Sequence, residues 1–190
     1  MATNKDAAFG LKAIGKVGQN RDNQGLSEYD IAASATAIYQ WDPVEMLATG
    51  TIGVAAAGDV LLGSLNGVFY TDASTSKPTW ANHLEASNTA TDIVGFVSDD
   101  PYERFEVQSN NTGASAQTDI GNVANIEYTA GSAPNYVSKV ELDDSDLATT
   151  DGQLKVIGVS KDPDNNDLTS ANVNWVVTIN EHFLKQEAGI

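Results

Sequence analysis

The chain has 190 residues, of which 26 are acidic and 10 basic, so its formal net charge is −16 at pH 7. A surface this negative repels nucleic acid and anionic lipid, so we expect neither nucleic acid nor a membrane as a partner, although acidity also serves solubility. The absence of cysteine excludes disulfides and thiolate metal sites, and no run of about 18 apolar residues predicts a transmembrane helix.

The first segment differs from the rest in charge. Residues 1–22 carry four basic and two acidic side chains, a net charge of +2, whereas the remaining chain carries 6 basic and 24 acidic side chains, a net charge of −18. Phe9, Leu11 and Ala13 alternate with Gly10 and Lys12, as in extended backbone, and the glycines disfavour a helix. Two interpretations of residues 1–22 remain open: an extended arm that adds a strand to a partner, or the first strand of the protein's own sheet.

From Leu26 onward the pattern predicts strands. Short runs rich in β-branched and aromatic residues end repeatedly at Gly, Asp, Asn or Pro. Asn66-Gly67, between two apolar runs, predicts a tight hairpin turn. The strands are expected at 37–41, 61–65, 68–71, 92–98, 104–108, 123–129, 136–142, 154–160 and 173–180. Regularly spaced short strands predict an all-β fold, with residues 23–190 forming a single β-barrel or β-sandwich domain behind the N-terminal arm.

Residues that could perform catalysis are few. The two histidines, His83 and His182, are far apart in sequence, and no nucleophile elbow or phosphate-binding loop is present. Asp99-Asp100 precedes a proline and is more typical of a turn than of a catalytic pair. We therefore expect a protein that is not an enzyme, with no catalytic residues and no cofactor.

Two segments, 143–146 and 162–167, have the oxygen-rich composition of a calcium site. In the second, Asp162, Asp164 and Asn166 fall at suitable spacing, but Asp167 stands where a calcium loop needs glycine, and Val173 where it needs glutamate. An ordinary polar loop is the better interpretation, and we expect no metal. Trp41 and Trp80 suggest sugar stacking, but aromatic residues scattered over strands are more often core or interface residues.

Several segments, in order, resemble a family of virion structural proteins of tailed phages, marine phages in particular, which are regarded as capsid decoration (cement) proteins. In this sequence Trp41 stands where that pattern has a glycine. The segments that carry the resemblance are 9–18, 31–34, 37–39, 41–44, 62–72, 77–80, 97–101, 105–108 and 180–182.

This resemblance implies a non-enzymatic protein on the outer capsid surface of the virion. Such a protein binds the major capsid protein lattice, assembles with itself as a small oligomer such as a homotrimer, and stabilises the shell against internal DNA pressure. The N-terminal arm would engage the shell, and the candidate interface residues are Phe9, Leu11, Lys12, Ile14, Lys16 and Val17. The alternatives are another virion component, such as a tail-tube or head–tail protein, and a glycan-binding β module.

Overall fold

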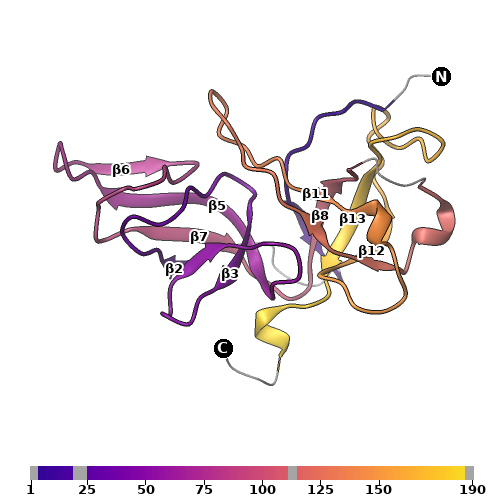
Figure 1. Cartoon of the computed structure of the whole chain (residues 1–190), viewed down its shortest axis with the longest axis horizontal. Helices are drawn as coiled ribbons and strands as arrows, with labels where there is room; N and C mark the ends of the chain where they lie inside the picture. The colour runs from indigo at the N-terminus through magenta and orange to yellow at the C-terminus, as the bar shows by residue number, and fades with distance from the viewer. Residues whose placement is uncertain (1–3, 19–24, 111–114, 187–190) are drawn as a thin grey trace.

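The computed structural model describes residues 4–18, 25–110 and 115–186 (Figure 1). These residues form an all-β structure, as the sequence predicts, together with three single-turn 3-10 helices. The strands are β1 (Lys12–Lys16), β2 (Ser27–Asp30), β3 (Pro43–Met46), β4 (Ile52–Val54), β5 (Leu61–Thr71), β6 (Pro78–Ala81), β7 (Val94–Ser98), β8 (Glu103–Gln108), β9 (Val123–Ala124), β10 (Ile126–Glu127), β11 (Glu141–Leu142), β12 (Leu154–Val159) and β13 (Asn174–Ile179). The 3-10 helices are η1 (Gln117–Asp119), η2 (Asp144–Asp146) and η3 (Phe183–Lys185).

The described strands form two large open antiparallel sheets and one two-stranded antiparallel ribbon, and no closed barrel is formed by the described residues. The first, which we call the β13 sheet, has the order β1-β8-β13-β12-β9. The second, the β5 sheet, has the order β2-β7-β5-β3-β4, with β6 also paired to β5. Figure 1 shows the two sheets side by side, with the short ribbon of β10 and β11 on the side of the β13 sheet.

Each sheet has its own hydrophobic cluster. In β13 and the residue before it, Val173, Trp175, Val177 and Ile179 are all buried, which confirms the predicted alternation of apolar and polar positions. The cluster of the β5 sheet is formed by residues of β3, β4, β5 and β7 and of the loops that cover one face of that sheet. The prediction of a single domain over residues 23–190 did not anticipate two separate clusters.

Leu61, at the start of β5, links the two halves of the molecule. Its side chain belongs to the cluster of the β13 sheet, whereas its neighbour Leu62 belongs to that of the β5 sheet. The Leu61 N–H also donates to the carbonyl of Glu181, which follows β13, at 3.0 Å. A long strand thus begins in one core and continues into the other.

The predicted hairpin at Asn66-Gly67 is wrong. Residues 61–71 form one continuous strand, and Asn66 lies at a β-bulge between Leu65 and Gly67 in the pairing with β7. Gly67 is required for packing rather than for a turn, because a Cβ atom there would lie 2.7 Å from the Trp80 ring. A glycine inside a strand often marks a bulge or a close approach, which the turn signal concealed.

The predicted strands at 123–129 and 136–142 are also shorter in the structure, where only β9, β10 and β11 are regular. The loop between β10 and β11 instead rises between the two sheets (Figure 1). There the Tyr136 ring stacks on His83 with 3.8 Å between ring centroids, and the Asn82 amide donates to the carbonyl of Asn135.

None of the described helices is long and apolar enough to cross a membrane.

A candidate interaction groove beside the N-terminal strand

The N-terminal segment is a strand of the protein's own sheet. β1 pairs antiparallel with β8, with Lys12 opposite Glu106 and Lys16 opposite Glu103. Of the two interpretations of residues 1–22, the structure thus shows a strand of the protein's own sheet at residues 12–16. Residues 1–3 and 19–22 lie outside the described part of the chain. The segment pairs with β8 because its apolar side chains find a core within the same molecule.

Leu11 shows why this segment cannot leave the body without cost. Its side chain is 0% exposed and packs in the cluster of the β13 sheet. Its N–H donates to the Trp41 carbonyl at 2.9 Å, and its carbonyl accepts a hydrogen bond from the Ser64 hydroxyl at 2.6 Å. Gly10 has a φ of +79°, and a Cβ atom there would lie 2.4 Å from the same Trp41 carbonyl oxygen. Leu11 is thus a core residue and not an exposed anchor for a partner.

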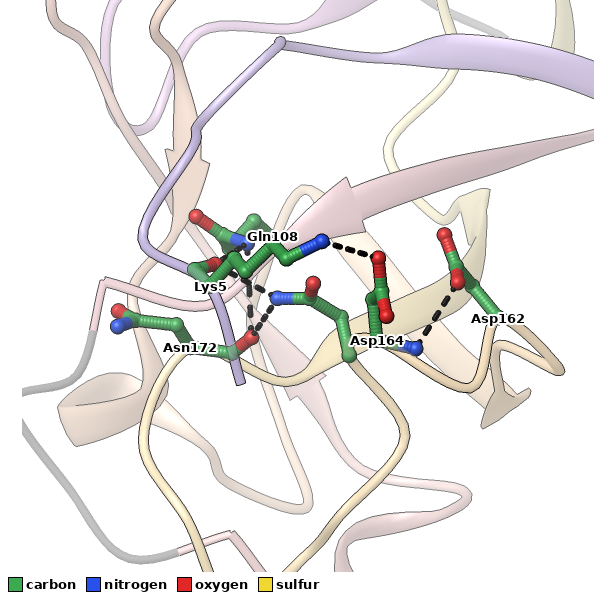
Figure 2. Close-up of polar contacts among 6 residues, drawn as sticks. Lys5, Gln108, Asp162, Asp164 and Asn172 are labelled. Carbon is green, nitrogen blue, oxygen red and sulfur yellow. Dashed lines mark hydrogen bonds and ion pairs between the residues drawn. The ribbon is translucent and has the colours of Figure 1, made fainter. Parts of the chain in front are cut away.

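A polar network fixes the residues before β1 to the far end of the β13 sheet (Figure 2). The Lys5 carbonyl accepts from the side-chain amides of Gln108, at 2.9 Å, and Asn165, at 2.7 Å, and the Lys5 ammonium pairs with Asp164. This ion pair raises the pKa of Lys5, first through its hydrogen bond to Asp164. Asn4, which is buried, donates to backbone carbonyls of Asp167 and Ala171.

The same network explains the aspartates of the candidate calcium loop. Asp162 accepts from the backbone N–H of Asp164 at 3.0 Å, and Asp164 pairs with Lys5 (Figure 2). Asp167 accepts from the hydroxyl and the N–H of Thr169, which lowers its pKa. In the described part of the chain, no group of three or more carboxylate or histidine side chains is arranged to hold a metal ion. The loop carboxylates serve the fold.

The other candidate interface residues lie on or next to β1. Phe9 is half-buried, and the Lys12 ammonium lies 5.6 Å from the centroid of the Trp41 ring. Lys16 forms an ion pair with Asp100 at 2.8 Å. Ile14 and Val17 have exposed side chains, 45% and 47% respectively. Among the candidate interface residues, Ile14 and Val17 are therefore the apolar side chains that face solvent.

Ile14 lies at an open groove of about 990 Å³ between the edges of the two sheets. β1 forms one wall, and the start of β2, the end of β7 and the 99–103 turn form the other. Eight large hydrophobic side chains are exposed in the described part of the chain, and four of them line this groove. These four are Ile14, Leu26, Tyr102 and Leu184. Sequence reasoning found only Ile14, because the other three come from connecting segments that have no periodic pattern.

The acidic residues of the groove are tied to its walls. Asp99 accepts from the Ser27 hydroxyl at 2.9 Å and the Tyr29 hydroxyl at 2.6 Å. Burial, followed by the hydrogen bond to Asp99, raises the pKa of Tyr29. Burial likewise raises the pKa of Glu103, against the opposing charge of Lys16. The hydrogen bonds of Asp99 join the end of β7 to β2, and the ion pair between Lys16 and Asp100 joins β1 to the 99–103 turn, so the groove is preformed by contacts within the chain.

The histidines of the sequence have separate surroundings. His182 is buried beneath the groove wall, and its Nδ1 accepts from the Leu184 N–H at 3.1 Å. Burial, together with the nearby Lys185, lowers the pKa of His182 to about 4, so its ring is neutral at pH 7. His83 stacks on Tyr136 and, more distantly, on Tyr39. His182 thus orients η3, which brings Leu184 to the groove.

The outer edge of β1 is poorly suited to pairing with a further strand. A β-bulge between Ala13 and Gly15 interrupts its register, and Lys12 and Lys16 flank that bulge. Bulges and lysines are the features by which natural edge strands avoid pairing with other chains. A partner at this groove would therefore contact side chains rather than extend the sheet.

Comparison of the chain with protein-family models, curated proteins and solved structures found no match.

Proposed function

We propose that this protein is a non-enzymatic capsid decoration protein of a tailed phage. It binds the outer surface of the major capsid protein lattice and stabilises the shell. The ordered resemblance along the sequence supports this class of protein. The location of the contact surface is inferred from one observation: the exposed side chains of Ile14, Leu26, Tyr102 and Leu184 cluster around one preformed groove. Concentrated exposed apolar surface is typical of protein–protein interaction sites.

The groove contact by itself is modest. Burying the exposed half of a large hydrophobic side chain contributes about 1 kcal/mol, so these four side chains contribute about 4 kcal/mol before the cost of association. A single site of this strength has a dissociation constant in or above the millimolar range. Stable decoration then depends on several linked copies that bind a repeating lattice at once, which multiplies the apparent affinity. A homo-oligomer, such as the trimer that the resemblance implies, meets this requirement.

The experiment is a co-sedimentation assay with phage shells that lack the protein. We expect the wild-type chain to saturate the shells, and Ile14→Asp combined with Leu184→Asp to bind at least about tenfold more weakly, because each introduces a charge into the buried contact. Ile157→Asp is the matched control, since Ile157 is also exposed but lies outside the groove. Equal binding of the groove variant and the wild type would reject the groove as the contact.

Electron microscopy of whole particles tests the class of protein independently. Density for this chain in clusters on the outer shell supports the decoration function. Density in the tail, or rings of six in solution, would replace it with the tail-tube or head–tail alternative. Absence of the chain from purified particles would reject both.

A further inference from the structure

A second exposed surface lies on the outer face of the β5 sheet. Phe69, Trp80, Val94 and Phe96 occupy this face, because their neighbours Val68 and Val97 point to the opposite face and into the core. The register places Phe69 opposite both Trp80 and Val94. We call these four residues the aromatic patch. Phe96 also lines the groove described above, so the two surfaces are continuous.

The Trp80 ring is exposed and yet held in place. It is 57% exposed, and Phe69 beside it is 41% exposed. The ring lies over the Cα of Gly67 and packs against Phe96 at 4.8 Å between centroids, with 53° between planes. One side of the ring covers the backbone of Gly67, which is a common arrangement for an aromatic residue next to a glycine in a neighbouring strand. The other side is a rigid apolar surface that loses little conformational entropy when a partner binds.

Two carboxylates border the aromatic patch on the edge strand β2. Glu28 lies opposite Phe96 and Asp30 opposite Val94, and both side chains are exposed. Neither has an ion-pair partner among the residues that the structure describes. This face of the β5 sheet therefore has an apolar end at Trp80 and a negatively charged end at Glu28 and Asp30 of β2, and no ion pair within the described chain compensates that charge.

We propose that this face binds an extended, cationic segment of a partner protein, with an apolar side chain on Trp80 and a lysine or arginine at Glu28 and Asp30. The row Trp80, Phe69, Val94, Asp30 crosses three inter-strand spacings, or about 14 Å. In an extended peptide, residues i and i+4 point to the same side and lie about 13 Å apart. The recognised segment thus carries its apolar and its cationic residue four positions apart.

Charge favours this occupant over two others. A second copy of the chain brings its own net charge of −16 to the same acidic edge, which repels it. A neutral sugar stacks on an exposed tryptophan but gains little from two uncompensated carboxylates. A lysine or arginine pairs with those carboxylates while its stem and the rest of the segment cover the aromatic rings. This inference does not depend on the capsid function, because any partner protein with such a segment could bind this face.

The test is calorimetric titration of the full-length protein with nine-residue peptides. The first has leucine third and arginine seventh in a Gly/Ser background; in the second the arginine is sixth, and in the third it is replaced by glutamate. We expect the first to bind at least about fivefold more tightly than the second, the third not to bind, and 0.5 M salt to weaken the first several-fold. Equal binding of the three peptides would overturn the proposal.

Variants locate the site. Glu28→Gln with Asp30→Asn should weaken the first peptide about fivefold, and Trp80→Ala about tenfold. Glu85→Gln with Asp162→Asn is the control, because it removes two exposed carboxylates elsewhere and should change nothing. Glu28→Lys with Asp30→Lys should reverse the preference towards the glutamate peptide, which tests the site even if Trp80→Ala misfolds. Trp80-dependent binding of neutral oligosaccharides, or Trp80-dependent self-association, in place of peptide binding would assign the face to a sugar or to a second copy instead.

Discussion

Replacing Leu11 by alanine tests whether the N-terminal strand is part of the folded body. Leu11 is fully buried in the cluster that includes Phe105, Val107 and Trp175. Removing a buried leucine side chain costs 2–5 kcal/mol, and with a cluster this closely packed we expect about 3 kcal/mol. For a chain of this size each kcal/mol lowers the melting temperature by about 2–4 °C, so Leu11→Ala should melt about 6–12 °C lower.

The assay is thermal unfolding by circular dichroism, supported by urea unfolding to give the free energy. Ile14→Ala is the matched control three residues further along the same segment, because its side chain is 45% exposed and its removal should cost less than about 1 kcal/mol. If Leu11→Ala melts within 1 °C of the wild type, then the segment is not packed in the core and the assignment of β1 to the β13 sheet is wrong.

Three further outcomes are expected. The fold lowers the pKa of His182 to about 4, so the contribution of the neutral ring to the free energy of unfolding is fully present above pH 6.5 and is lost, by up to about 3 kcal/mol, as pH falls towards 4. His182→Gln should make the free energy of unfolding, measured by urea titration, depend less on pH between about 4 and 7. Burial raises the pKa of Asp42 to about 6, so its ionised form destabilises the fold progressively as pH rises from about 4 to 6; Asp42→Asn should raise the melting temperature at pH 8 and lose that advantage at pH 4. Gly67→Ala should displace the Trp80 ring and cost about 1–3 kcal/mol, visible as a shift of tryptophan fluorescence before unfolding; an unchanged spectrum would contradict the contact over Gly67.

The sequence predicted those elements whose signal is local. In β13 the alternation of apolar and polar residues is complete, and the prediction matches within two residues. At Asn66-Gly67 the local signal was misleading, because the glycine accommodates a ring from another strand and not a turn. The alternation around Leu11 predicted extended backbone, but the choice between partner and own sheet depends on β8, which is about 90 residues away in sequence. The groove was least predictable, because Leu26, Tyr102 and Leu184 meet only once both sheets are formed.

The contacts of Asn4 with Ala171 have a consequence for synthesis on the ribosome. They join residues 167 positions apart, so Asn4 waits roughly 10–30 s for Ala171 to be synthesised at ordinary rates of translation. The β5 sheet uses only residues 27–98 and can close early, whereas β8 and β12 flank β13 and lack their shared neighbour until residues 174–179 emerge. The molecule is therefore completed in two stages, and the exposed margins of the later sheet are where chaperones, or faulty association between nascent chains, would act.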